Sequence, residues 1–161
     1  MKKILIFILI IFTVGCSKNN NEKIYLGEKY YEESKFIEIS SNDLKKENYV
    51  VYIYNNYCSL KIPCDTIFKK VMDKYNLTFL SLPFEETKKT FIYSKVKYAP
   101  SIVVISSNKI VAYLDVNSDE DYSKYQNEKD FEKWLSKYIY LEKKTKLISY
   151  IYYRGDYERI K

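Results

Sequence analysis

Histidine is absent from the 161 residues of this sequence. Its absence excludes a Ser-His-Asp triad, a Cys-His catalytic pair and every metal site that needs an imidazole ligand. The chain also has only three cysteines, three glycines and three prolines. A zinc site built from cysteine alone needs more thiolates than the sequence can supply. The sequence therefore indicates no metal or other cofactor, and the chemistry that remains is thiol chemistry.

The bulk composition is that of one globular domain. Hydrophobic residues make up 47% and charged residues 30% of a chain of ordinary domain length. We assign most of the 19 tyrosines to the core and the sheet surfaces, with an interaction surface as the alternative. The formal net charge is +6, but basic and acidic residues alternate along the chain. No basic patch stands out, so nucleic-acid binding is not predicted.

The first fifteen residues have the pattern of an export signal. Lys2 and Lys3 precede a short apolar stretch over residues 4–12, which is too short to span a membrane comfortably. Gly15 followed directly by Cys16 resembles the bacterial lipoprotein signal, in which the cysteine is acylated and becomes the new N-terminus. An ordinary signal peptide and an uncleaved anchor are the alternatives. The lipoprotein pattern predicts an exported chain, anchored by lipid to the outer face of the cytoplasmic membrane or to the outer membrane.

The polar residues 16–34 show little apolar periodicity, which predicts a tether between the lipid and the domain. The pair Tyr30-Tyr31 marks the place where packing on the domain is expected to begin.

Two cysteines lie where a predicted strand gives way to a predicted helix. The β-branched and aromatic residues 49–54 predict a buried strand, and Cys58 and Cys64 follow it. Apolar residues then recur at helical spacing: Ile67, Phe68, Val71, Met72 and Tyr75. A helix start offers unpaired N–H groups and a partial positive charge, both of which favour a thiolate over a thiol.

This arrangement resembles the thioredoxin superfamily, in which a buried strand delivers an aromatic-Cys-x-x-Cys loop to the start of a helix. Tyr57-Cys58 corresponds to the aromatic residue and the first cysteine, and Pro63-Cys64 to the proline and the second. Five residues separate the two cysteines here, against two in the family. Pro100, just before the apolar residues 102–105, resembles the family's cis-proline before a central strand.

The order of the predicted elements fits the same resemblance. We expect strands at 36–39, 49–54, 77–82, 102–105 and 110–114, helices at 40–48, 64–76, 85–92 and 127–139, and an acidic loop at 115–125. The last two strands are expected to form a hairpin, although the turn between them lacks a glycine. Asn76 is the expected end of the second helix, and Asn127 is the expected cap of the last. The prediction is an α/β, thioredoxin-like three-layer fold over residues 35–140, with a central mixed sheet and flanking helices. Residues 141–161 form a basic, tyrosine-rich extension outside the family pattern, which either lengthens the last helix or adds strands.

A lipid on Cys16 leaves Cys58 and Cys64 as an even pair in a compartment that permits disulfides. On a continuous helix, residues six apart lie about 9 Å apart along the axis and on different faces. The two cysteines can therefore pair only if residues 59–62 form a loop and the helix begins near Pro63.

The resemblance implies thiol-disulfide exchange with exported proteins, in which Cys58 attacks and Cys64 resolves the mixed disulfide, or the reverse. The alternative is a non-catalytic binding or accessory lipoprotein in which the pair is a structural disulfide. A third reading is an envelope lipoprotein whose tyrosine-rich surface holds a partner. Tyr52 occupies the place where many thioredoxins keep a buried acid, so that aid to proton transfer is not expected here.

Overall fold

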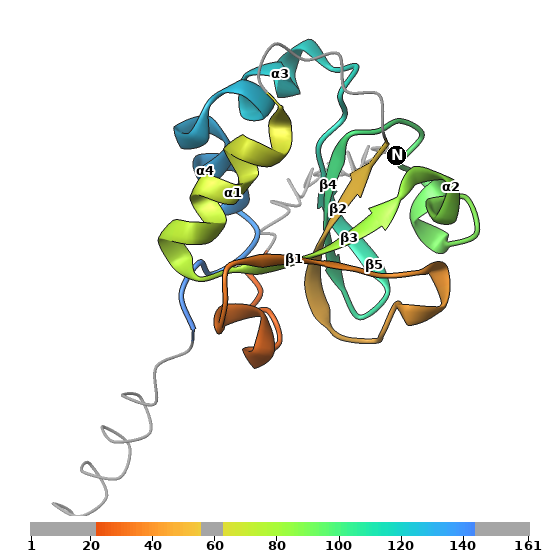
Figure 1. Ribbon diagram of the computed structural model, residues 1–161, viewed down its shortest axis with the longest axis horizontal. Helices are drawn as coiled ribbons and strands as arrows, with labels where there is room; N and C mark the ends of the chain where they lie inside the picture. Colours follow the sequence, from red (N-terminus) through yellow and green to blue (C-terminus); the bar gives the residue numbers. More distant parts are fainter. Residues whose placement is uncertain (1–21, 56–62, 144–161) are drawn as a thin grey trace, which may run out of the picture.

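The computed structural model describes residues 22–55 and 63–143, which form a mixed sheet flanked by helices (Figure 1). The strands are β1 (Lys35–Glu38), β2 (Asn48–Tyr54), β3 (Thr78–Pro83), β4 (Ser101–Ser106) and β5 (Lys109–Tyr113). The α-helices are α1 (Cys64–Tyr75), α2 (Phe84–Thr87), α3 (Asp119–Gln126) and α4 (Glu128–Leu135). Three short 3-10 helices complete the described elements: η1 (Glu28–Tyr31), η2 (Ser41–Asp43) and η3 (Phe91–Ser94).

The sheet has the strand order β1-β3-β2-β4-β5, so β2 lies at its centre. β1, β3 and β2 run parallel, whereas β4 is antiparallel to β2 and β5 to β4. Helices α1, α3 and α4 lie on one face of the sheet and α2 on the other (Figure 1). This arrangement is a thioredoxin-like fold, and it confirms the predicted fold class.

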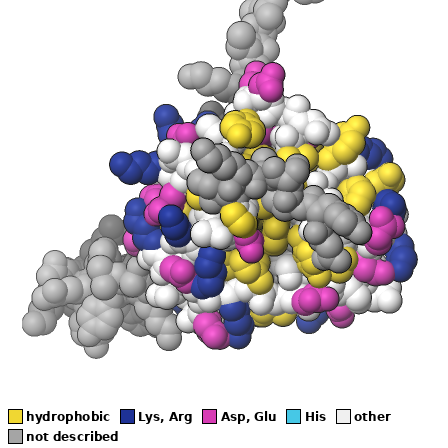
Figure 2. Space-filling view, turned by 45° about the horizontal axis from the view of Figure 1, so that its top comes forward, with side chains coloured by type: hydrophobic (Ala, Val, Ile, Leu, Met, Phe, Trp, Pro, Cys, Tyr) yellow, Lys and Arg dark blue, Asp and Glu magenta, His cyan; other side chains and the backbone are white. Residues whose placement is uncertain are grey.

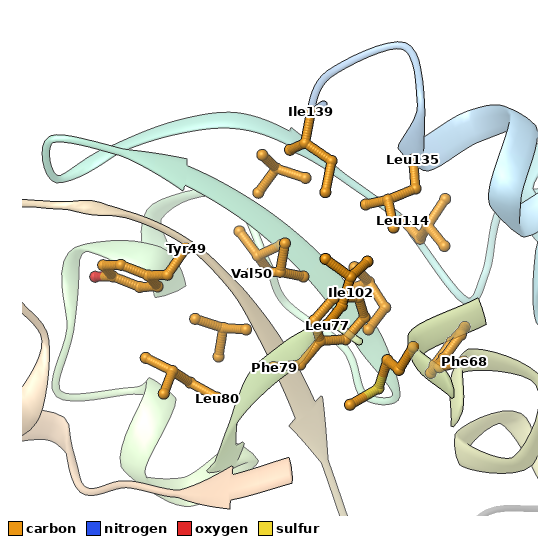
Figure 3. Close-up of a cluster of buried hydrophobic side chains, with 14 of the residues drawn as sticks. Tyr49, Val50, Phe68, Leu77, Phe79, Leu80, Ile102, Leu114, Leu135 and Ile139 are labelled. Carbon is orange, nitrogen blue, oxygen red and sulfur yellow. The ribbon is translucent and has the colours of Figure 1, made fainter. Parts of the chain in front are cut away.

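The core forms where apolar strands are covered on both faces. In β2, Val50, Val51 and Ile53 are fully buried, as are the four apolar residues of β4. A strand that is covered on both faces has a continuous run of apolar residues rather than an alternating pattern. This is why β2 and β4 could be recognised in the sequence. Leu135 and Ile139, from the C-terminal part of the domain, close the core from the side of the helices (Figure 3).

Helix α1 has the start and the end that its sequence predicts. It begins at Cys64 directly after Pro63, and it ends at Tyr75 before Asn76. Asn76 takes the left-handed conformation with φ 53° and donates its N–H to the carbonyl of Met72. An αL cap of this kind satisfies a carbonyl that the last turn leaves without a helical partner.

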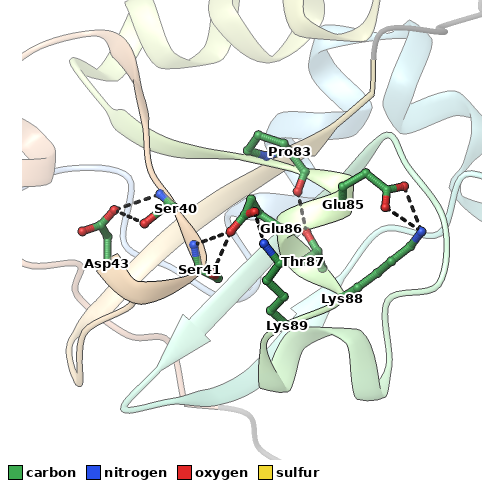
Figure 4. Close-up of polar contacts among 9 residues, drawn as sticks. All are labelled: Ser40, Ser41, Asp43, Pro83, Glu85, Glu86, Thr87, Lys88 and Lys89. Carbon is green, nitrogen blue, oxygen red and sulfur yellow. Dashed lines mark hydrogen bonds and ion pairs between the residues drawn. The ribbon is translucent and has the colours of Figure 1, made fainter.

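The helix predicted for residues 40–48 is wrong, because a reciprocal cap closes a single 3-10 turn there. The backbone N–H and the hydroxyl of Ser40 both donate to Asp43 Oδ2, at 2.8 and 2.7 Å (Figure 4). Leu44 is then extended, with ψ 122°, and β2 starts at Asn48. The local side-chain bonds thus end the turn before a helix can propagate.

The helix predicted for residues 85–92 is divided into α2 and η3. Between them, Thr90 is extended and its hydroxyl accepts the N–H of Ile92, which starts a new turn. The Glu86 carboxylate accepts bonds from Lys89 Nζ and from Ser41 Oγ, at 2.5 and 2.7 Å, and so joins α2 to η2 (Figure 4). These bonds, from Lys89 first and then Ser41, lower the pKa of Glu86 to about 2.

The predicted acidic loop at 115–125 is wrong, since it contains most of α3. Three acidic residues occupy the first turn of α3, where the helix dipole favours negative charge: Asp119, Glu120 and Asp121. Asn127 then begins α4, and its side-chain oxygen accepts the N–H groups of Lys129 and Asp130. The predicted cap at Asn127 is confirmed.

Packing on the domain begins before Tyr30-Tyr31, where the sequence predicts it. Ile24 forms a parallel bridge with Ile139, and Leu26, Tyr30 and Tyr31 are buried. The hydroxyl of Tyr31 donates to the carbonyl of Tyr140 at 2.6 Å. Residues 24–31, which belong to the segment predicted as a tether, therefore pack on the domain, because a few apolar side chains are enough to hold this polar segment there.

The predicted hairpin of β4 and β5 forms without glycine. Ser107 and Asn108 take positive φ values of 49° and 63°, the left-handed pair that a two-residue hairpin turn requires. Within residues 22–55 and 63–143, no helix is long and apolar enough to cross a membrane. The predictions for the signal sequence and for residues 144–161 lie outside the described residues.

Candidate functional site

Cys64 is the first residue of α1, and its side chain is buried with 1% of its surface exposed. Pro63 immediately precedes the helix and is exposed, so the helix begins where a Cys58–Cys64 pair would need it to begin. Cys16 and Cys58 lie outside the described residues. Of the three predicted cysteine sites, the structure thus places Cys64, at the end of the sheet where β2 leads into α1 (Figure 1).

A tyrosine hydroxyl lies beside the sulfur of Cys64. Tyr52, on the central strand β2, places its Oη 3.5 Å from Cys64 Sγ, and either atom can be the donor. From the sequence alone, Tyr52 marks only the absence of a buried acid, and this contact is not predicted. The signal was present in the strand alternation, because Tyr52 and Tyr54 share the face of β2 that is turned toward the helix opened by Cys64.

An aromatic layer between the sheet and the helices fixes Tyr52. Its ring centroid lies 5.3 Å from that of Phe36 and 5.6 Å from that of Phe68. Phe68 in turn lies 4.6 Å from Phe131 and 5.9 Å from Tyr125. These are the separations of favourable tilted and edge-to-face aromatic pairs. The residue beside Cys64 is therefore held by α1 and the sheet together.

Pro100 lies at the start of β4, and the Ala99–Pro100 peptide bond is cis. Its carbonyl accepts a hydrogen bond of 3.1 Å from the hydroxyl of Tyr125, a fully buried residue of α3. Burial raises the pKa of Tyr125 strongly, and the nearby charges of Asp121, Cys64 and Asp115 raise it further. Tyr125 thus links the proline segment to the surroundings of Cys64.

Two exposed tyrosines flank this region in the sequence. Tyr98, two residues before Pro100, is 56% exposed, and Tyr122, three residues before Tyr125, is 53% exposed. Figure 2 brings the upper end of the molecule forward and shows hydrophobic side chains gathered near the middle of that face. No group of three or more metal-ligating side chains occurs in the part of the chain that the structure describes.

Two thioredoxins are among the solved structures similar to this chain. A thioredoxin from Schistosoma mansoni matches with 20% sequence identity and a TM-score of 0.44, covering 67% of this chain and 99% of that chain. Thioredoxin f from spinach chloroplast matches with 17% identity and a TM-score of 0.42, covering 65% and 97%. No family model and no curated protein matches the chain. The strand order and the placement of the helices define the fold as thioredoxin-like.

Proposed function

We propose that this protein exchanges disulfides with other exported proteins through Cys58 and Cys64. The observation that carries the proposal is the position of Cys64, which opens α1 with its sulfur 3.5 Å from the Tyr52 hydroxyl. A helix start favours a thiolate, and a neighbouring hydroxyl offers it a donor. Because the sequence has no histidine and too few cysteines for a zinc site, we assign thiolate chemistry to this position.

The exchange proceeds in two displacements. The Cys58 thiolate attacks a partner's disulfide, forms a mixed disulfide and releases one partner thiolate, which takes up a proton from solvent. The Cys64 thiolate then attacks the sulfur of Cys58, closes the Cys58–Cys64 disulfide and releases the second partner thiolate. Two electrons pass from the cysteine pair to the partner, and the reverse sequence oxidises a partner dithiol.

A structural disulfide in a non-catalytic accessory lipoprotein is the second candidate function. The observation that favours it is the burial of Cys64, with 1% of its surface exposed. A thiol so enclosed suits a permanent bond in an exported domain as well as it suits a resolving cysteine. The two candidates differ in whether Cys58 forms covalent adducts with other proteins.

Replacing Cys64 with serine is expected to trap mixed disulfides between Cys58 and envelope proteins, because the resolving thiol is gone. The Cys58→Ser variant is the matched control and should trap far fewer adducts, since Cys64 is buried. Cells are quenched with an alkylating reagent, and adducts are identified by non-reducing electrophoresis and mass spectrometry. No adducts with Cys64→Ser, together with equal losses of stability in both variants, would establish the structural disulfide instead. Trapping by Cys58→Ser would reverse the two roles.

We further propose that Cys16 carries the lipid that anchors the chain to a membrane on the exported side. The support is the sequence pattern of a basic start, a short apolar stretch and Gly15-Cys16. Cys16→Ser is expected to abolish the incorporation of a labelled fatty acid, whereas Cys58→Ser should leave it unchanged. Labelled lipid in the Cys16→Ser protein would contradict the anchor.

A further inference from the structure

We propose that Tyr52 is a positioning residue for Cys64, whose thiolate accepts a hydrogen bond from the Tyr52 hydroxyl during disulfide exchange. The inference rests on the proposed function, and it adds a residue for which the sequence predicted no such part. The Tyr52 hydroxyl would then stabilise the Cys64 thiolate as a neutral hydrogen-bond donor. It would not act as a base that accepts the proton of the thiol.

The direction of the hydrogen bond follows from the chemistry of the two groups. While Cys64 is a thiol, either the S–H or the O–H can donate across the 3.5 Å between Sγ and Oη. Once the thiol has lost its proton, only the phenol can donate, because a thiolate has none to give. A phenol with an ordinary pKa near 10 keeps its proton at neutral pH, and its bond to an anion is stronger than its bond to a neutral thiol. The contact therefore favours the thiolate.

The packing around Tyr52 keeps its hydroxyl in place. The ring lies between Phe36 of β1 and Phe68 of α1, with centroid distances of 5.3 and 5.6 Å. Phe68 is one helical turn after Cys64, so the residue that holds the ring and the residue that receives the bond belong to the same rigid helix. The donor is thus oriented before the thiolate forms, which lowers the cost of ordering it.

Other titratable groups near Cys64 also affect its ionisation. Tyr125 of α3 is close enough to Cys64 for the two to interact electrically, and Asp121 and Asp115 act on the same tyrosine. Asp65 follows Cys64 on α1 and is exposed. The carboxylates disfavour a nearby thiolate, and the helix start favours it. A substitution at Tyr52 leaves all of these groups in place.

The test is a titration of Cys64 alone. The full chain carrying Cys16→Ser and Cys58→Ser retains one cysteine, and labelling with cysteine enriched in ¹³C at Cβ gives one resonance that reports deprotonation. Adding Tyr52→Phe is expected to raise the pKa of Cys64 by about one unit, the size of one hydrogen bond to a charged group. Tyr54→Phe is the matched control, because Tyr54 lies two residues along the same strand with its ring 6.0 Å from that of Tyr52.

The outcomes separate this inference from the proposed function. A pKa of Cys64 that is the same with Tyr52→Phe as with the parent would overturn the inference, even if Cys64→Ser traps adducts. A raised pKa in Tyr52→Phe but not in Tyr54→Phe would support it, even if no adducts are trapped. A purely structural role for Tyr52 would lower the free energy of unfolding without moving the Cys64 titration, and that result would also overturn it.

Discussion

Replacing Phe68 with alanine is expected to lower the free energy of unfolding by about 3–5 kcal/mol, the usual cost of emptying a large aromatic site in a core. Phe68 is fully buried and makes ring contacts with Tyr52, Tyr125 and Phe131. One side chain thus joins the sheet to α1, α3 and α4. Removing the Phe68 ring leaves a cavity. The three rings around it belong to separate elements, so they cannot all move to fill it.

The measurement is a denaturant titration followed by far-ultraviolet circular dichroism. Tyr122→Ala is the matched control, because Tyr122 is an aromatic residue of α3 that is 53% exposed, and we expect a change within about 0.5 kcal/mol. A loss of less than about 1 kcal/mol in Phe68→Ala would contradict the role of this residue as the centre of the aromatic layer.

A rise of pH from 10 to 12 is expected to destabilise the domain strongly through its buried tyrosines. Burial, followed by Tyr30 and Glu47, raises the pKa of Tyr49 to about 12. A tyrosine whose pKa is higher in the folded than in the unfolded chain stabilises the fold below pH 10, and this contribution is lost as the pH rises to 12. Between pH 10 and 12 this loss is about 2 kcal/mol from Tyr49 alone, and the raised pKa of Tyr125 adds to the loss.

Tyr49→Phe separates this effect from general alkaline damage. The Tyr49 hydroxyl is buried and has no hydrogen-bond partner among the described residues. Removing it should therefore leave the free energy of unfolding at pH 7 unchanged or raise it by up to about 1 kcal/mol. The same variant should lose about 2 kcal/mol less than the parent between pH 10 and 12. Equal losses in the two proteins, measured by denaturant titrations at each pH, would show that Tyr49 is not responsible.

The positions of the strands along the chain could be predicted from the sequence, because strands that are buried on both faces are continuous runs of apolar residues. The runs at 49–54 and 102–105 are almost wholly β-branched or aromatic, and both are central strands. Helix ends could also be predicted where a single residue sets them. Asn76 ends α1, and Asn127 caps the start of α4. Local chemistry and tertiary packing favour the same structure at these positions.

Short helices were harder to predict, because one hydrogen bond can divide or end them. The Ser40–Asp43 cap shortens one predicted helix to a single turn, and the Thr90 hydroxyl helps split another. In α3, an acidic sequence with one buried residue, Tyr125, shows no apolar face, and such a pattern predicts a loop. In each of these three segments, fewer than three apolar residues are buried in the core, so the sequence shows little helical periodicity.

The candidate site was predictable in position but not in its contacts. Cys64 at a helix start followed from the strand and helix patterns on either side. The Tyr52 hydroxyl at its sulfur did not, because a tyrosine in a buried strand reads as hydrophobic surface whether or not its oxygen has a polar neighbour. Contacts between two side chains twelve positions apart depend on the crossing of strand and helix, which composition does not specify.

The bridge between Ile24 and Ile139 sets how far the domain can stand from its proposed anchor. Eight peptide units separate Cys16 from Ile24, so their Cα atoms can be at most about 28 Å apart. A tether ending at residue 34 would allow more than twice that distance. If Cys16 carries the proposed lipid, a connection of this length would hold the domain close to the membrane surface. It would then raise the effective concentration of the domain toward cysteines of other membrane-bound proteins and keep it from cysteines that lie far from the surface.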